Sequence, residues 1–216
     1  MVVAGAGADL GPAARPTVEE LLAGLLGGSL APGLSAVRQI LEDMARLDVA
    51  VYEAVAATST PALDEPLRRL STAANRSALW LAITAGLAVV GGRRGRRAAI
   101  SGVASILVSS AVVNLPLKAL YARERPDRVG VLPRHVRMPE SSSFPSGHSA
   151  SGFAFATAVG RELPLLSLPL RVLAAAVAYS RVHTGVHYPG DAIAGSVLGG
   201  AIGLGVSGAV ERRLGR

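Results

Sequence analysis

The sequence of 216 residues contains no cysteine, which excludes disulfide frameworks, thiolate metal sites and cysteine nucleophiles. Aromatic residues make up only 4% of the chain, and the basic clusters contain hardly any of them. Because single-stranded nucleic acids are bound largely by stacking on aromatic rings, we expect no nucleic-acid partner. The 22 basic residues outnumber the 15 acidic ones, for a net charge of +7. An anionic lipid or an anionic substrate is therefore the expected partner.

Hydrophobic residues account for 50% of the chain, and many fall in uncharged runs that arginine clusters separate. Runs of this length and composition predict transmembrane helices. The sequence thus predicts an all-α fold, a polytopic membrane helical bundle of about five to six transmembrane helices. The five expected spans are residues 77–92, 98–117, 149–163, 169–179 and 192–210.

Two features refine these predicted spans. Trp80 lies near the start of the first span, where an indole ring is expected at the depth of the lipid headgroups. Gly195, Gly199 and Gly203 recur at every fourth position of the last span, a spacing that suits close helix packing in lipid. Whether this stripe packs within the chain or between copies in a homo-oligomer is left open.

The N-terminal part differs from the rest. Residues 17–57 show helical periodicity, but charges recur too often for a membrane span. We expect residues 1–47 to form a tail and an amphipathic helix at the membrane interface. Residues 48–210 would form the membrane domain, and residues 211–216 a basic C-terminal tail.

The distribution of arginine predicts the orientation in the membrane. In a five-span arrangement, the arginines of residues 93–97 and 211–216 fall on one side, which the positive-inside rule assigns to the cytoplasm. The loop of residues 116–145 then faces the extracytoplasmic side of the cell membrane. That loop is also basic, which indicates that its charges serve a ligand.

Two polar stretches follow or precede these spans. Lys118 and Arg125 lie about two helical turns apart, so both can reach one face and bind a phosphate, although a solvated basic face is the alternative. Ser146, Gly147 and His148 precede an apolar helical run. With Ser146 as the cap, the free backbone N–H groups beside it form an anion site, and an ordinary capped helix is the alternative.

A third stretch holds Arg181, His183, His187 and Asp191 between the last two spans. Polar residues at this depth are costly without a role. The Asp191 carboxylate can hold His187 in one tautomer and favour its charged form, as in hydrolases that use histidine. Asp191 as a plain helix cap is the alternative, and His183 is left without a role.

The three stretches read K-x6-R-P, P-S-G-H and S-R-x5-H-x3-D, and together they closely resemble the signature of the type 2 phosphatidic acid phosphatase superfamily. The resemblance covers about residues 48–208. It implies that Lys118, Arg125, Arg181, Ser146 and the Gly147 backbone bind phosphate oxygens. It also implies that His187 attacks phosphorus to form a phosphohistidine, that Asp191 orients His187, and that His148 protonates the leaving group. No carboxylate-rich cluster accompanies these cations, so we expect neither a metal nor another cofactor.

The resemblance implies a membrane-bound lipid phosphate or pyrophosphate phosphatase. Its substrate would be a polyprenyl phosphate or diphosphate, a polyprenyl-linked phosphoribose, phosphatidylglycerophosphate or phosphatidic acid. One alternative is a vanadate-dependent haloperoxidase, which shares the anion pocket but is soluble in the examples we compare. The other is a non-catalytic lipid-binding membrane protein, which would not need His187 and Asp191.

Overall fold

The structure, a computed structural model, describes residues 31–128 and 134–214. All regular elements in these two ranges are helical. The chain divides into two compact units, Met1–Arg46 and Leu47–Arg216, which are described separately. The expected tail, and residues 17–30 of the expected amphipathic helix, lie outside the described residues.

The first unit is described from residue 31 onward, within helix α2 (Ala31–Ala57). Val37, Ile40, Leu41 and Met44 are exposed and follow the spacing of one helix face. Exposed ion pairs join Arg38 to Glu42 and Arg46 to Asp43 on the same helix. The described part of this helix is therefore amphipathic, as expected.

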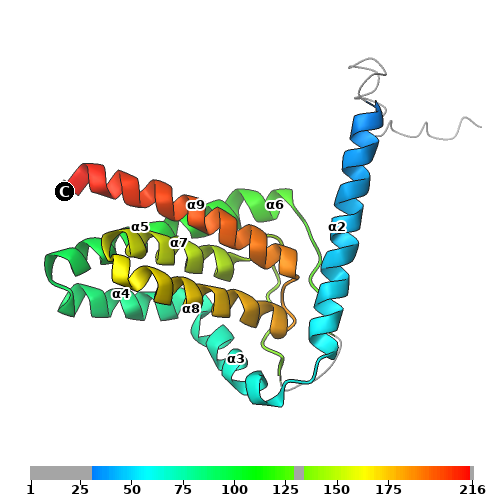
Figure 1. Cartoon of the computed structure of the whole chain (residues 1–216), viewed down its shortest axis with the longest axis horizontal. Helices are drawn as coiled ribbons and strands as arrows, with labels where there is room; N and C mark the ends of the chain where they lie inside the picture. Colours follow the sequence, from blue (N-terminus) through cyan, green and yellow to red (C-terminus); the bar gives the residue numbers. More distant parts are fainter. Residues whose placement is uncertain (1–30, 129–133, 215–216) are drawn as a thin grey trace, which may run out of the picture. The chain divides into compact units, whose positions relative to one another are not determined.

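The second unit is a bundle in which α7 is the central helix, packed against α5, α8 and α9 (Figure 1). Small residues of α7 such as Ala150, Ala154 and Gly160 are buried, which lets the neighbouring helices approach its backbone. The main helices of this unit are α3 (Pro61–Ala73), α4 (Ala78–Val90), α5 (Gly92–Val112), α7 (Gly147–Glu162), α8 (Pro164–His183) and α9 (Pro189–Leu214).

Three described segments are long and apolar enough to cross a membrane, namely Gly92–Leu120, Pro164–His183 and Pro189–Leu214. Each contains one of the predicted spans. Helices α3 and α4, bent by 63° at their junction, form a fourth candidate. The all-helical membrane fold is confirmed, but the described residues supply three or four spans by this measure, where five or six were expected.

Helix α7 accounts for part of this difference. Its 16 residues extend about 24 Å at 1.5 Å per residue, less than the roughly 30 Å of a hydrocarbon core. It still carries the chain from Gly147 at one end of the bundle to the start of α8 at the other, so it crosses with the bundle, and its apolar run at residues 149–163 is covered by other helices.

Trp80 is not at an exposed interface position, contrary to the expectation. Its side chain is 1% exposed and lies against Phe155 of α7, with ring centroids 5.3 Å apart. Gly152 of α7 faces the indole, and an added Cβ there would lie 2.9 Å from Trp80 Cζ2. A missing side chain on α7 thus makes room for the largest side chain of α4.

The glycine stripe of α9 packs within the chain. A Cβ added at Gly195, Gly199 or Gly203 would collide with the backbone carbonyl oxygens of Ser146, Ala150 and Ala154 on α7. The stripe therefore brings α9 into backbone contact with α7, and this face is already covered in a single chain.

The helices of this unit start and stop at two opposite ends of the bundle (Figure 1). At one end, α8 stops at His183, α9 begins at Pro189 and α7 begins at Gly147. At the other end, α9 ends at Leu214 close to the turn between α4 and α5, so residues 211–214 of the expected tail are helical.

Candidate active site

The three polar stretches converge on one cavity of about 230 Å³ at the first of these ends. Its walls include Lys118, Arg125, Gly147, His148 and His187, which come from all three stretches. The central structural expectation, that distant parts of the chain build a single cationic cavity, is therefore confirmed.

Lys118 and Arg125 do not share a helix face, contrary to the expectation. The helical segment ends after Leu120, and Arg125 lies on extended chain directly before Pro126. A residue that precedes proline is biased away from the helical conformation, which fits the non-helical chain at Arg125. Both side chains are instead directed by Ser141: Lys118 Nζ donates to its Oγ and Arg125 Nε to its carbonyl oxygen, each at 2.9 Å.

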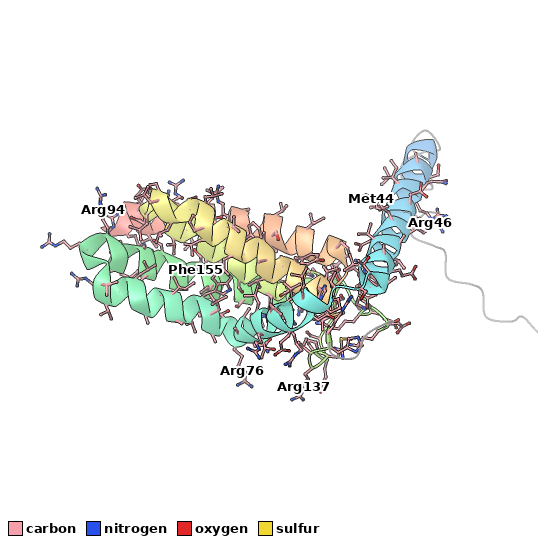
Figure 2. The ribbon with its side chains drawn as sticks, turned by 60° about the horizontal axis from the view of Figure 1, so that its bottom comes forward. Met44, Arg46, Arg76, Arg94, Arg137 and Phe155 are labelled. Atoms are coloured by element: carbon pink, nitrogen blue, oxygen red, sulfur yellow. The ribbon has the colours of Figure 1, made fainter. Side chains whose placement is uncertain are left out.

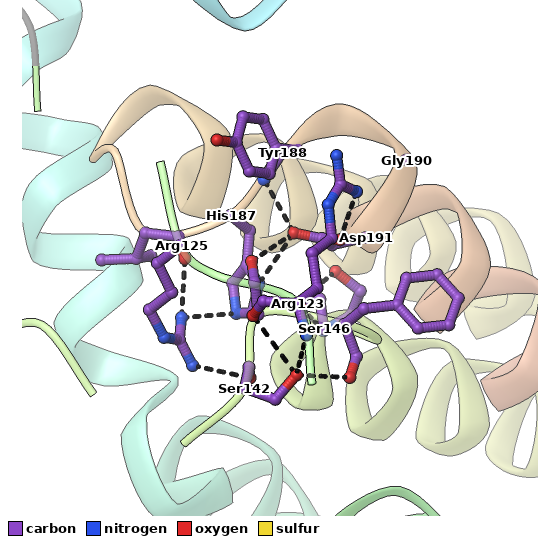
Figure 3. A network of polar contacts seen from close by, with 12 residues as sticks. Arg123, Arg125, Ser142, Ser146, His187, Tyr188, Gly190 and Asp191 are labelled. Atoms are coloured by element: carbon purple, nitrogen blue, oxygen red, sulfur yellow. Dashed lines mark hydrogen bonds and ion pairs between the residues drawn. The ribbon is translucent and has the colours of Figure 1, made fainter. Parts of the chain in front are cut away.

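The contact between Arg125 and His187 defines the imidazole tautomer (Figure 3). Arg125 Nη1 donates to the carbonyl oxygen of Val186 at 2.6 Å and lies 3.4 Å from His187 Nε2. A guanidinium has only donors, so this nitrogen must accept. The proton of neutral His187 is therefore on Nδ1, and Nε2 carries the lone pair, on the side of Arg125.

His187 is 2% exposed, and burial lowers its pKa to about 4. The contact with Asp191 opposes this shift, whereas the charges of Arg125 and Arg181 act with burial. Because a lowered pKa favours the unprotonated form, His187 is a neutral imidazole at pH 7. The site thus holds an unprotonated imidazole nitrogen among cations.

Asp191 lies at the start of α9 and is completely buried. Its Oδ2 lies 3.6 Å from His187 Nδ1 and accepts hydrogen bonds from the Ser143 hydroxyl and, at 2.9 Å, the backbone N–H of Tyr188. These donors stabilise the ionised carboxylate, which faces the protonated side of His187. Asp191 therefore contacts the imidazole of His187 as well as the start of α9.

Arg123 and Asp48 extend this network and were missed in the sequence. Arg123 contacts Asp191 Oδ1 at 2.8 Å and Asp48 Oδ2 at 2.7 Å, and its guanidinium lies 4.2 Å from the centre of the Tyr188 ring (Figure 3). Asp48 Oδ1 also accepts the backbone N–H of Gly190 at 2.6 Å. In the sequence, Arg123 is one of several loop arginines and Asp48 one of several charges on α2, so no spacing singles them out.

The start of α7 has the expected form. Ser146 is its N-cap, and its hydroxyl accepts the N–H of Ser149 at 3.4 Å. Ser146 is fully buried, and the residues of this stretch that line the cavity are Gly147 and His148.

His148 is held from a direction that the sequence did not indicate. Its Nε2 lies 3.0 Å from Asn75 Oδ1, at the junction of α3 and α4. Burial, with the charges of Arg181 and Lys118, keeps the pKa of His148 far below its ordinary value. Unlike His187, this imidazole has no carboxylate beside it.

Arg181 lies behind the cavity wall, 1% exposed, and Nη1 donates to Ser71 Oγ at 2.6 Å. Its Nε has no hydrogen-bond partner among the described residues. Its backbone carbonyl oxygen accepts the N–H groups of Val186 and His187 at 3.1 and 3.3 Å, which places it beside the turn that holds His187. A buried guanidinium with an unused donor suits an anion that enters later.

His183 does not line the cavity. Its Nε2 lies 3.0 Å from Asp64, which Arg134 also contacts at 2.7 Å. This buried cluster joins α3 to α8 and gives His183 a structural role. Among the residues that the structure describes, no group of three or more His, Cys, Asp or Glu side chains is placed to hold a metal ion.

Comparison with known proteins agrees with this geometry. Residues 99–214 match the family model of the PAP2 superfamily. The decaprenylphosphoryl-5-phosphoribose phosphatase of Mycobacterium tuberculosis is 36% identical over 160 residues, which cover 73% of this chain and 88% of that protein. The lipid A 1-phosphatase of Rhizobium etli is 34% identical over 105 residues, 46% of this chain and 45% of that one.

A solved structure shares the fold. The transmembrane PAP2 type phosphatidylglycerolphosphate phosphatase of Bacillus subtilis superimposes with a TM-score of 0.59 and 24% identity, over 81% of this chain and 89% of that one. The family match covers more than half of the chain, and the three polar stretches lie within or beside one cavity. The chain therefore belongs to the PAP2 superfamily.

Proposed function

We propose that this protein is a membrane lipid phosphatase that hydrolyses a phosphomonoester or diphosphate through a phosphohistidine on His187. One observation carries the proposal: His187, whose Nε2 lies 3.4 Å from Arg125 Nη1, lines a cavity that is also lined by Lys118, Arg125 and His148. Relatives named as phosphatases of phosphorylated lipids support the same reaction class.

Phosphate binding falls to the cations of the cavity. Phosphoryl transfer spreads negative charge over the equatorial oxygens, and fixed positive charges aimed there stabilise the transition state. Lys118 and Arg125 would contact these oxygens directly, and Arg181 would approach through its unused Nε. The backbone N–H groups at the start of α7 add to this site, with Ser146 holding the turn.

In the first step, His187 Nε2 forms a bond to phosphorus while the bond between phosphorus and the leaving oxygen breaks. His148 gives a proton to that oxygen. In the free enzyme the surrounding cations disfavour protonated His148, and a bound phosphate would neutralise those charges and support protonation. Asp191 stabilises the positive charge that His187 gains on phosphorylation.

In the second step, water attacks phosphorus and the bond to Nε2 breaks. His148, now neutral, accepts the proton of the water, and inorganic phosphate leaves. His187 returns to the tautomer with its proton on Nδ1, opposite Asp191. Each step needs only residues of the cavity, the lipid substrate and water.

The lipid class and the side of the membrane also belong to this proposal. An end of a membrane bundle lets the headgroup enter the cavity while the lipid tail stays in the bilayer. The name of the mycobacterial relative, a decaprenylphosphoryl-5-phosphoribose phosphatase, favours a polyprenyl-linked phosphoribose as the substrate of this protein. We assign the cavity to the extracytoplasmic side of the cell membrane, because the arginines of residues 93–97 lie at the other end of α5.

The test is phosphate release from a panel of lipid phosphates by the purified full-length protein in detergent. His187→Ala should abolish release, and alkaline-quenched wild type should carry radiolabelled phosphate that His187→Ala lacks. His135→Ala is the matched control, because His135 does not line the cavity, and it should keep its activity. Normal turnover by His187→Ala would exclude the proposed nucleophile.

A further inference from the structure

A second hollow adjoins the catalytic cavity. This outer chamber has a volume of about 700 Å³, and Arg76, Pro139 and His148 line both spaces. Its other lining residues include Asn75, Arg137 and Glu140. Small-molecule sites commonly measure about 300 to 1,000 Å³, so the catalytic cavity alone is small and the two together have the size of a complete substrate site.

The position of His148 indicates what enters the outer chamber. In an in-line displacement, the leaving oxygen lies opposite the attacking nitrogen, so the general acid marks the leaving side. His148 lines both spaces, and its Nε2 contacts Asn75, which lines only the outer chamber. With His148 as the general acid, the leaving group would extend from the catalytic cavity into the outer chamber.

The outer chamber carries two arginines without internal partners. Arg76 and Arg137 are exposed, and neither forms an ion pair or hydrogen bond with any residue that the structure describes. Figure 2 shows both side chains projecting from one part of the bundle, far from Arg94. Glu140 is the one acidic side chain in the described lining, so the formal charge is positive with His148 neutral.

The backbone at Arg76 supports a functional role for this residue. Arg76 and Ser77 have φ angles of 53° and 59°, in the left-handed region that residues with a side chain rarely adopt. This conformation forms the bend between α3 and α4, where Asn75 reaches His148 and Arg76 lines both spaces. Such strain is retained where the surrounding structure imposes it, commonly at binding sites.

We propose that the outer chamber binds a second phosphate, carried by the leaving group of the substrate, through Arg137 and Arg76. This inference rests on the proposed function, because it needs the leaving group to depart past His148. Two substrate classes have the required chemistry. In a prenyl diphosphate the second phosphate is joined directly to the first, and in a prenyl-phosphoryl sugar phosphate it lies beyond a sugar.

The test compares kcat/KM for a prenyl monophosphate, a prenyl diphosphate and a prenyl-phosphoryl sugar phosphate. For at least one two-phosphate substrate, Arg137→Gln should lower kcat/KM about tenfold more than for the monophosphate, as expected for one charge-assisted hydrogen bond. Whichever two-phosphate substrate shows this difference identifies the spacing that the chamber accepts. Arg94→Gln, an exposed arginine at the other end of the bundle, is the matched control and should affect all three equally.

Glu140→Gln supplies a change of opposite sign. Removal of this negative charge should lower KM for the same two-phosphate substrate. The preference for that substrate over the monophosphate should therefore increase. The inference is overturned if Arg137→Gln and Glu140→Gln change all three substrates by the same factor, or if both match Arg94→Gln. Failure of the proposed function would be distinct, since the wild type would then release phosphate from none of the three.

Discussion

Burial lowers the pKa of both imidazoles of the cavity, and their different partners distinguish them. Two histidines line one cavity, but Asp191 contacts only His187. Arg125 faces Nε2 of that ring and the carboxylate faces Nδ1, so opposite charges act on its two nitrogens. This difference is the physical basis for treating His187 as the nucleophile and His148 as the acid.

The lowered pKa of His187 predicts that the enzyme stays active at mildly acidic pH. With a pKa near 4, the nucleophile stays unprotonated as the pH falls from 7 to 5, whereas an ordinary histidine would be mostly protonated. For an aryl phosphate, whose leaving group needs no proton from His148, we expect kcat/KM, corrected for ionisation of the substrate phosphate, to be nearly constant over that interval. A corrected profile that falls with an apparent pKa of about 6.5 would contradict this environment for His187.

Arg123 is expected to be a positioning residue, because it contacts Asp191 and Asp48 and does not line the cavity. Arg123→Gln should lower kcat about 10- to 100-fold, the range seen when a partner of a site residue is lost, with little change in KM. Arg123→Lys should recover only part of this loss, because one ammonium cannot span two carboxylates.

Steady-state kinetics and thermal unfolding of both variants separate positioning from simple stability. A positioning role predicts a change in kcat at an unfolding temperature close to wild type. If KM rises and kcat is kept, Arg123 binds substrate instead and its assigned role is wrong.

The residues with chemistry could be predicted because each is polar within an otherwise apolar stretch. Their supporting residues could not, because the contacts that define them join distant parts of the chain. Arg123 and Asp191 are 68 residues apart, and Asp48 and Gly190 are 142 apart. Asn75 was missed for the same reason, since its contact with His148 spans 73 residues. Only the folded bundle brings these pairs together.

At the scale of helices, the glycine stripe of α9 sets how closely it approaches α7. Gly199→Ala places a methyl group against the Ala150 backbone, which can yield only if a helix moves. We expect a loss of about 1–3 kcal/mol, as for overpacked sites. Gly205→Ala on the same helix is the matched control, since its Cβ would meet nothing within 4 Å.

Thermal unfolding in one detergent measures both variants. The control should be neutral or slightly stabilising, because alanine favours the helix over glycine by about 1 kcal/mol. Equal stability of the two variants would show that α9 does not rest on the α7 backbone. Since Ser146 lies under Gly195 on the same stripe, a displaced α9 should also lower activity.

The helices themselves show what an apolar run does and does not reveal. Residues 98–117 and 192–210 were predicted correctly as spans because uncharged length is a property of the sequence alone. The run at residues 149–163 gave the same signal, but there the apolar surface is covered by α5, α8 and α9. Burial in lipid and burial in protein select the same residues, so hydropathy does not distinguish them.

In the whole molecule, the two ends of the bundle carry basic residues with different surroundings. Near the turn between α4 and α5, Arg93, Arg94 and Arg96 are exposed. At the site end, Arg123 and Arg125 are held by carboxylates and by backbone carbonyl groups, whereas Arg76 and Arg137 are exposed. Exposed arginines next to span ends are the ones available to set orientation. Those at the end opposite the site, namely Arg93, Arg94, Arg96, Arg212 and Arg213, outnumber Arg76 and Arg137 at the site end.

This asymmetry predicts the topology, and the absence of cysteine makes it measurable. Asp127→Cys lies in the loop at the site end, and Arg94→Cys lies at the turn between α4 and α5; both positions are exposed. A membrane-impermeant maleimide should label Asp127→Cys in intact cells and label Arg94→Cys only after permeabilisation. The reverse pattern would place the cavity in the cytoplasm and exclude a lipid substrate that is displayed only on the outer surface. Labelling of both positions in intact cells would mean an even number of membrane crossings between residues 94 and 127, which a continuous span at Gly92–Leu120 does not allow.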